Sequence, residues 1–303
     1  MQARTAYLLV MAGAALWGST GLFVNELNTA GFSPWEVVGI RLTFSAVLLW
    51  ALLFVFDRSL LRIRVKDIGF FIGTGIISIA FFNYFFFTVI ETASISLAVV
   101  LLYTGPVFVA LISRFTFQEA FTRKKGAALI LMLLGCGFTV GLLPAGASVM
   151  QGTTIIFGIL SGFFYALYSI FGKYVSGLYH AFTITAYSML FGSLFLIPTS
   201  RLWEKAPLFA DPAVLLYGLG LAAVATVSAY VLYTIGLKWI ESGKAAILST
   251  VEPVVAIIIG VLVYQESMTW WQGAGMLLVL GSVLLTVKLR REPPPPAVNH
   301  RAG

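Results

Sequence analysis

The sequence predicts an all-α membrane protein with ten transmembrane helices, arranged as two inverted halves of five helices each. Three observations lead to this prediction: an apolar composition, a regular series of apolar spans and an internal repeat. Apolar residues make up 59% of the 303 residues and charged residues only 10%, with a mean hydropathy of +0.96. Soluble domains carry about 25% charged residues, so we expect lipid to solvate much of this surface.

Ten apolar segments are long enough to cross a bilayer, which takes about 20 helical residues. They cover residues 6–24, 35–56, 68–90, 95–113, 126–143, 153–171, 182–199, 213–237, 245–264 and 270–287. With ten spans, 16 Lys and Arg residues fall on one side of the membrane and 2 on the other, while Arg41 lies inside the second span. Cytoplasmic loops carry an excess of Lys and Arg, so this alternation predicts a cell-membrane protein with both termini in the cytoplasm.

The internal repeat relates residues 98–140 to residues 245–287 at a constant offset of 147, and 14 of these 43 positions are identical. Each copy consists of a helix broken by a proline (Pro106 or Pro253), a polar turn containing Gln-Glu, and a second helix. Because each half has five spans, an odd number, the second copy enters the membrane in the opposite direction to the first. Inverted repeats are typical of transporters that work by alternating access. We therefore expect one half at residues 6–143, a second at 153–288, and a disordered proline-rich tail at 292–303.

These features resemble the EamA family of the drug/metabolite transporter superfamily, and the resemblance covers nearly the whole chain. The residues that carry it are Trp17-Gly18-Ser19 in the first span, Arg41 in the second, and the equally spaced sets Pro106, Glu119, Gly126 and Pro253, Glu266, Gly273. The resemblance implies two EamA repeats, a central cavity and secondary transport, often export of amino acids or related metabolites. The second half departs from the pattern, with Tyr165 roughly where Trp17 would align, so we expect the two walls of the cavity to differ chemically.

Glu252 is the main candidate for substrate binding. It lies about eight residues into its span, or ~12 Å at 1.5 Å per residue, close to the centre of a ~30 Å hydrocarbon core. A carboxylate at that depth must face the bundle interior or water. Pro253 and Pro106 each remove a backbone donor and kink a helix at this level. Glu252 is then either a ligand for a cationic substrate group, a proton acceptor, or a structural carboxylate.

Arg41 is the other charge within a span. Its side chain either extends to the interface, pairs with Glu252, or binds a substrate carboxylate; the first two roles are favoured.

Aromatic residues at helical spacing predict the rest of the binding site, because a tyrosine hydroxyl in mid-span needs a partner and so should face inward. The candidates for substrate contact are Trp17, Tyr84, Tyr103, Tyr165, Tyr168, Tyr230 and Tyr233. A cavity lined by these rings, with few charges, suits a small amphipathic solute. For any single aromatic residue, plain packing is the commoner role.

Several functions are disfavoured. The sequence contains no G-x-x-x-x-G-K-[ST] motif, so ATP-driven transport by this chain alone is not expected. One Cys and two His residues provide no evident metal site, and no cofactor, catalytic residue or nucleic-acid partner is predicted.

The predicted function is therefore secondary transport, most plausibly export of amino acids or similar solutes, with a proton as a possible coupling ion. Besides the substrate, the predicted partner is the lipid bilayer, and the sequence defines no oligomeric state. Two alternatives stay open: an exchanger of phosphorylated sugars or nucleotide-sugars on the same fold, and a membrane protein that does not transport, either a scaffold or an intramembrane enzyme. Phosphorylated substrates rank lower because they need several buried cations and only Arg41 is deep.

Overall fold

The computed structural model describes residues 3–143 and 152–287, and all regular structure within these ranges is helical. The helices are α1 (Ala3–Gly18), α2 (Thr20–Thr29), α3 (Pro34–Phe56), α4 (Ile68–Ile72), α5 (Phe81–Thr92), α6 (Ile95–Leu102), α7 (Gly105–Thr116), α8 (Arg123–Thr139), α9 (Gly152–Ser176), α10 (Ala181–Ser200), α11 (Pro212–Ala222), α12 (Ala229–Trp239), α13 (Ser242–Leu248), α14 (Val251–Val263) and α15 (Trp270–Val287). Short 3-10 segments η1 (Arg58–Leu61), η2 (Val65–Asp67) and η4 (Leu202–Ala210) join some of them. The predicted tail at 292–303 lies outside the described residues.

These helices form the ten predicted spans, several of them in two consecutive pieces. In the described residues, nine helical segments are long and apolar enough to cross a membrane. The remaining predicted span corresponds to α8, which has 17 residues and so falls just short of the 18 required there. The fourth span breaks between α6 and α7, and the ninth between α13 and α14, directly ahead of the predicted prolines. The structure thus confirms the all-α membrane fold.

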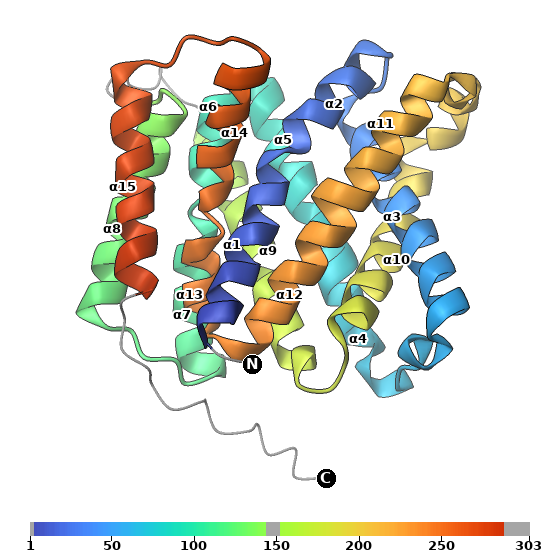
Figure 1. The fold of residues 1–303 in the computed structure, drawn as a ribbon, viewed down its shortest axis with the longest axis horizontal. Helices are drawn as coiled ribbons and strands as arrows, with labels where there is room; N and C mark the ends of the chain where they lie inside the picture. The colour runs from blue at the N-terminus through green and yellow to red at the C-terminus, as the bar shows by residue number, and fades with distance from the viewer. Residues whose placement is uncertain (1–2, 144–151, 288–303) are drawn as a thin grey trace.

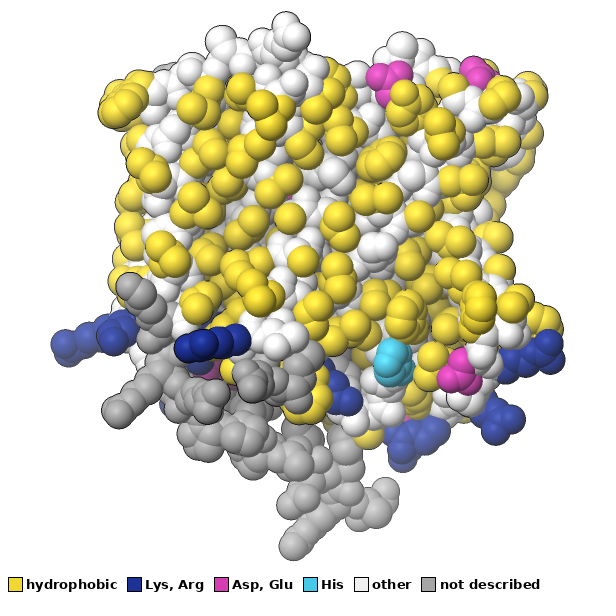
Figure 2. Space-filling view, in the orientation of Figure 1, with side chains coloured by type: hydrophobic (Ala, Val, Ile, Leu, Met, Phe, Trp, Pro, Cys, Tyr) yellow, Lys and Arg dark blue, Asp and Glu magenta, His cyan; other side chains and the backbone are white. Residues whose placement is uncertain are grey.

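The two ends of the bundle differ in charge (Figure 1, Figure 2). On the face shown in Figure 2, Lys and Arg side chains gather along the lower rim, and hydrophobic side chains cover the surface above them. We call the lower end, where α7 ends and α8 begins, the basic end. The turn between α14 and α15 lies at the other end, called here the opposite end. Helix α7 runs toward the basic end, whereas its repeat partner α14 runs away from it.

The polar residues shared by the two repeat copies build the same turn twice. Gln118 and Gln265 adopt left-handed backbone conformations, with φ of 56° and 55°. This conformation is uncommon for a residue other than glycine, so its recurrence identifies a specific turn. Thr122 and Thr269 then accept hydrogen bonds from the backbone N–H groups three residues later and cap α8 and α15. These roles explain why polar residues recur at the offset of 147.

Glycines allow α9 to pack closely against the broken fourth span. A Cβ at Gly162 would collide with the Thr104 hydroxyl oxygen and lie 2.9 Å from the Leu101 carbonyl oxygen. A Cβ at Gly158 would collide with the Leu101 side chain. The Gly158/Gly162 pair therefore serves packing between helices of one chain, as small residues commonly do in membranes.

This close packing makes a stability prediction. Gly162→Ala should lower the thermal unfolding midpoint in detergent, because backbone atoms of α6 and α7 block the new methyl group and overpacking costs ~1–3 kcal/mol. Gly69→Ala is the matched control, since no atom lies within 4 Å of the Cβ position at Gly69. That variant should unfold at the wild-type temperature or slightly above it, because alanine favours helix over glycine. Equal midpoints for the two variants would contradict the packing argument.

Candidate substrate site

A cavity of about 240 Å³ lies where α1, α2, α6, α8 and α14 meet. It far exceeds the ~10–15 Å³ needed by one water molecule and is smaller than the ~300–1,000 Å³ typical of drug-sized ligand sites. On α14 the lining runs from Glu252 to Ile257, and on α8 it begins at Thr139, the last residue of that helix. The cavity therefore extends from the middle of the bundle toward the opposite end.

Glu252 provides the carboxylate of this cavity. Among the described residues that line it, there is no other acidic residue and no Lys, Arg or His. The Glu252 side chain forms no hydrogen bond or ion pair shorter than 4.0 Å within the described chain. It projects from the first turn of α14, where the backbone N–H groups at a helix N-terminus favour negative charge. A carboxylate in this position is available to a solute in the cavity.

The broken ninth span and α1 approach each other very closely beside this carboxylate. A Cβ at Gly18 would lie only 2.7 Å from the Glu252 backbone oxygen. At the corresponding place in the first half, Gly105 packs as closely on Tyr165, 2.8 Å from a Cβ at Gly105 to a ring carbon. Gly105 occupies the position of Glu252 at the repeat offset, so only the second half brings a carboxylate to the crossing.

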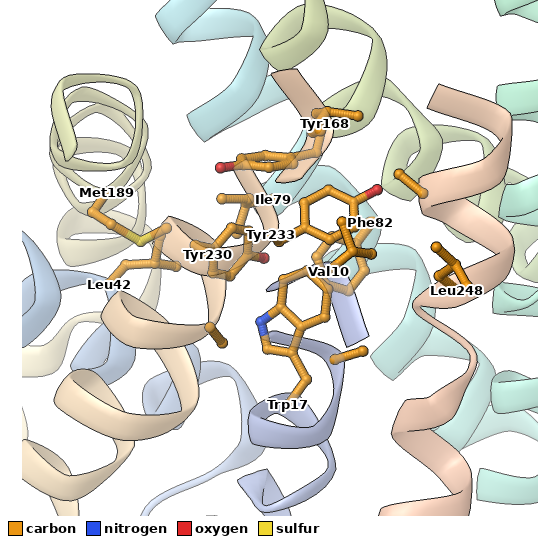
Figure 3. Packing of buried hydrophobic residues seen from close by; sticks show 14 of the residues in the cluster. Val10, Trp17, Leu42, Ile79, Phe82, Tyr168, Met189, Tyr230, Tyr233 and Leu248 are labelled. Atoms are coloured by element: carbon orange, nitrogen blue, oxygen red, sulfur yellow. The ribbon is translucent and has the colours of Figure 1, made fainter. Parts of the chain in front are cut away.

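A cluster of aromatic rings lies next to the cavity (Figure 3). The Trp17 ring centroid lies 5.0 Å from that of Tyr230 and 5.2 Å from that of Tyr233, and Tyr168 lies 4.9 Å from Tyr230. Trp17 also lines the cavity. Tyr165 joins these rings around a second, much smaller cavity. The structure therefore brings together predicted residues from α1, α9 and α12.

The polar atoms of this cluster are only partly paired. The Tyr168 hydroxyl is 2.9 Å from the Thr234 hydroxyl, and the Tyr233 hydroxyl is 2.7 Å from that of Ser169. The indole N–H of Trp17 is buried and has no acceptor among the described residues. A buried donor left unpaired costs ~1–3 kcal/mol, and such groups are often found at functional sites.

Arg41 is held at the edge of the aromatic cluster. Its Nε donates to the Thr226 hydroxyl at 2.9 Å, and its guanidinium carbon lies 5.8 Å from the Tyr230 ring centroid. Thr226 belongs to η5 (Ala223–Ser228), a π-helical segment between α11 and α12. Single π-helical turns occur frequently at functional sites. Arg41 forms no ion pair with Glu252 within 4.0 Å, although the two charges are near enough to interact electrostatically.

Tyr84 is the predicted site residue that lies apart. Its side chain is 55% exposed and contacts Trp35 and Phe85, at centroid distances of 6.2 Å and 5.3 Å. The reason is the π-helical segment η3 (Gly73–Ala80) that precedes α5. A π-helix has more residues per turn than an α-helix, so it rotates every following side chain away from the face that a 3.6-residue period predicts. Phe82 faces the aromatic cluster instead.

Sequence reasoning did not identify the cavity residues at helix ends, such as Thr20, Gly21 and Thr139. These small residues form no period along a single helix. They meet only because α1, α2 and α8 converge in the fold. Of the three, only Thr139 is marked in the sequence, because Thr286 repeats it at the offset of 147.

An ionic cluster, here named the basic-end cluster, lies at the basic end of the bundle. It consists of Glu119, Lys125, Lys173, Glu241 and Lys244. The Glu119 carboxylate accepts hydrogen bonds from the Ser242 and Gly243 backbone N–H groups at the start of α13 and from the Ser113 hydroxyl. Lys125 Nζ lies 3.4 Å from Glu119 and 2.9 Å from Glu241, and Lys244 Nζ lies 2.7 Å from Glu241.

The surrounding lysines keep the Glu241 carboxylate of this cluster ionised at neutral pH. Burial alone would raise the pKa of Glu241, but the hydrogen bond from Lys244 and the charge of Lys125 outweigh it, so the pKa lies below the ordinary value of 4.5. A carboxyl group with a lowered pKa stabilises the folded arrangement above its unfolded pKa and loses that contribution as the pH falls through the lowered value. Lys173 Nζ adds hydrogen bonds to carbonyl oxygens at the end of α12, at 2.7 Å from both Leu237 and Ile240.

Comparison with known proteins gives consistent matches over nearly the whole chain. An uncharacterized transporter of Archaeoglobus fulgidus is 27% identical over 280 residues, covering 91% of this chain and 94% of the relative. The threonine/homoserine exporter RhtA of Escherichia coli K12 is also 27% identical, over 94% of this chain and 92% of the exporter. The uncharacterized transporter YetK of Bacillus subtilis is 24% identical, over 95% and 88%.

A solved crystal structure shares the fold, with a TM-score of 0.74 at 17% identity, over 93% of this chain and 96% of that one. The model of the EamA-like transporter family matches the chain twice, at residues 4–141 and 152–288. The chain is therefore a multi-pass membrane protein that belongs to the EamA-like transporter family.

Proposed function

We propose that this protein is a secondary transporter that moves small amphipathic metabolites, chiefly amino acids or related amines, outward by alternating access. The observation that carries the proposal is the unpaired Glu252 carboxylate in a cavity of about 240 Å³ whose other described lining residues are uncharged. A solute with one cationic group and an apolar body complements such a site. Glu252 then binds the amino group or exchanges it for a proton.

The orientation follows from charge. Both termini lie in the cytoplasm of a cell-membrane protein, because 16 of the 19 Lys and Arg residues then fall on the cytoplasmic side. The basic end is then cytoplasmic, and the cavity opens toward the exterior. The two halves, residues 6–143 and 153–288, rock against each other about the site as inverted repeats do.

The aromatic rings and Arg41 complete the binding site in this proposal. Trp17, Tyr103 and the Tyr165–Tyr168–Tyr230–Tyr233 group enclose the apolar part of the solute. Arg41, fixed by Thr226 beside Tyr230, supplies the positive field for a carboxylate. The breaks ahead of Pro106 and Pro253 free backbone groups at the same depth.

A phosphorylated substrate fits less well. A site for such anions needs several cationic side chains. The described residues that line the cavity include one carboxylate, Glu252, and no Lys or Arg. A scaffold function would leave the cavity and its unpaired carboxylate without a role. Transport, not catalysis, is also the activity printed in the names of the relatives above.

The first test is counterflow in proteoliposomes, with labelled amino acids, organic amines and sugar phosphates, in the presence and absence of a pH gradient. Vesicles preloaded with the unlabelled solute should accumulate labelled amino acid or amine well above protein-free vesicles. A dependence on the pH gradient would identify a proton as the coupling ion. Accumulation of sugar phosphates alone would contradict the proposal and make Arg41 the centre of the site, and no accumulation of any solute would favour a scaffold.

Replacing the carboxylate should abolish most transport. Glu252→Gln keeps the size of the side chain but removes a charged hydrogen-bonding group worth ~1.5–3 kcal/mol, so initial counterflow rates should fall at least about tenfold. The control is Glu91→Gln, an exposed glutamate outside the cavity, which should transport at the wild-type rate. Unchanged transport by Glu252→Gln would exclude a role for its charge.

The hydroxyl groups of Tyr103 and Tyr84 give a second matched pair. Tyr103 is 3% exposed and lines the cavity, whereas Tyr84 is 55% exposed and lies apart from it. Losing a hydrogen bond worth ~0.5–1.5 kcal/mol in Tyr103→Phe should raise the KM by roughly twofold to tenfold. Tyr84→Phe should leave the KM unchanged. The reverse pattern would place the substrate beside α5 instead of in the cavity.

A further inference from the structure

The turns that follow α7 and α14 present Glu119 and Glu266 on the same backbone framework. In addition to the matching left-handed Gln118 and Gln265, each glutamate N–H donates to a carbonyl six residues earlier, that of Ser113 or Gly260, at 3.2 Å in both cases. The two carboxylates thus leave equivalent turns at opposite ends of the bundle.

Their surroundings in the structure differ. Glu119 is 5% exposed, and its carboxylate binds the first two N–H groups of α13, at Ser242 and Gly243. Helix α13 packs on α7 there. Glu266 is exposed, lies against Gly260 of the preceding helix α14, and forms no side-chain hydrogen bond or ion pair within the described chain.

The repeat offset identifies the missing partner of Glu266. Subtracting 147 from Ser242 and Gly243 gives Ile95 and Ser96, the first two residues of α6. Ile95 is 65% exposed, and the only side-chain cap at this helix start is the Ser94 hydroxyl, which accepts from the Leu97 N–H at 3.2 Å. The start of α6 therefore offers free N–H groups at the same end of the bundle as Glu266.

We propose that Glu266 is a gating residue that holds the transporter closed at the opposite end by accepting hydrogen bonds from the Ile95 and Ser96 N–H groups. Glu119 does the same at the basic end through α13, and the two contacts form in alternation. The assignment rests on the transport function proposed above. It gives each half one glutamate that binds the broken helix of the other half.

The two gates differ in strength. Lys125 and Glu241, which form an ion pair at the basic end, correspond at the repeat offset to Gln272 and Ser94. Charge-assisted hydrogen bonds are roughly twice as strong as neutral ones. The gate at the opposite end thus has one charged group where the basic end has several, which favours the arrangement seen in the structure, closed at the basic end.

Spin-label distances test the gate directly. Labels on the cysteines of Ile95→Cys and Ser267→Cys, in a Cys136→Ala background in nanodiscs, report the separation between the start of α6 and the turn that carries Glu266. The wild-type sequence should give mainly a long distance. Glu119→Gln should weaken the basic-end gate and raise a short-distance population.

The decisive variant combines Glu119→Gln with Glu266→Gln. The ratio of short to long distances should fall at least about tenfold relative to Glu119→Gln alone, whereas Glu91→Gln in the same background should leave it unchanged. A short-distance population that persists in Glu119→Gln/Glu266→Gln would overturn the assignment, as would the absence of any short-distance population in Glu119→Gln.

A transplanted ion pair provides a gain-of-function test. Ser94→Glu with Gln272→Lys recreates the Glu241–Lys125 pair at the opposite end and should shift the distances toward the short population. Ser94→Ala with Gln272→Lys is the control for loss of the Ser94 cap, and it should not produce the shift. Adding Glu266→Gln to the Ser94→Glu/Gln272→Lys variant should restore the long distances. Short distances that persist in this triple variant would contradict a role for Glu266 in the closed arrangement.

Counterflow on the same variants separates the two proposals. If wild-type protein transports and Glu266→Gln lowers the exchange rate while Glu91→Gln does not, both proposals hold. If Glu266→Gln transports as wild type does, the gating role fails and the transport function stands. If the wild-type protein moves no solute, the transport function fails, whatever the distances show.

Discussion

A hydrocarbon core offers no hydrogen bonds, and this constraint decides where every polar group of the structure lies. Continuous helices satisfy their own backbone, but the spans that break at Tyr103–Thr104 and Ser249–Thr250 do not do so completely. A break of this kind is tolerated only where protein or a water-filled cavity surrounds it. Both breaks are packed against helices that glycines bring very close, Gly162 of α9 in one half and Gly18 of α1 in the other. The central cavity lies beside the second of these crossings.

The two halves share a framework but not a chemistry. At the repeat offset, Glu252 corresponds to Gly105, Arg41 to Ser188 and Lys125 to Gln272. Ser188 of α10 forms a neutral hydrogen bond with Thr74 of η3 at 2.6 Å. In the equivalent pair of segments, Arg41 of α3 donates to Thr226 of η5. At each of these three positions a charged residue in one half corresponds to an uncharged residue in the other. In the proposed binding site the carboxylate and the guanidinium lie on different sides, an arrangement that would orient a solute carrying both signs of charge.

Much of the fold could be predicted from the sequence because hydropathy and positive charge report directly on the membrane. The broken helices could be predicted from their prolines, and Glu252 from its depth in an apolar span. The location of Tyr84 could not, because the π-helical turn at Gly73–Ala80 has no marker in the residue pattern and changes the angular period after it. The basic-end cluster was also missed. Lys125 and Lys244 look like ordinary loop cations in sequence, and their burial results from contacts between residues about 120 positions apart.

The broken ninth span connects the Glu252 carboxylate in the cavity with the N–H groups that Glu119 binds at the basic end. Its first piece, α13, begins at the N–H groups bound by Glu119, and its second piece, α14, begins one residue before Glu252. A solute that bound Glu252 and moved α14 relative to α1 would act on α13 through the short Ser249–Thr250 link. Binding energy shifts a two-state equilibrium only by the difference in affinity for the two states. Glu252 and the N–H groups that Glu119 binds belong to one discontinuous helix, so a movement of α14 would change the free energy of the contact between Glu119 and α13. In the proposed transport cycle, this connection is the route by which a bound solute would bias which end of the protein is closed.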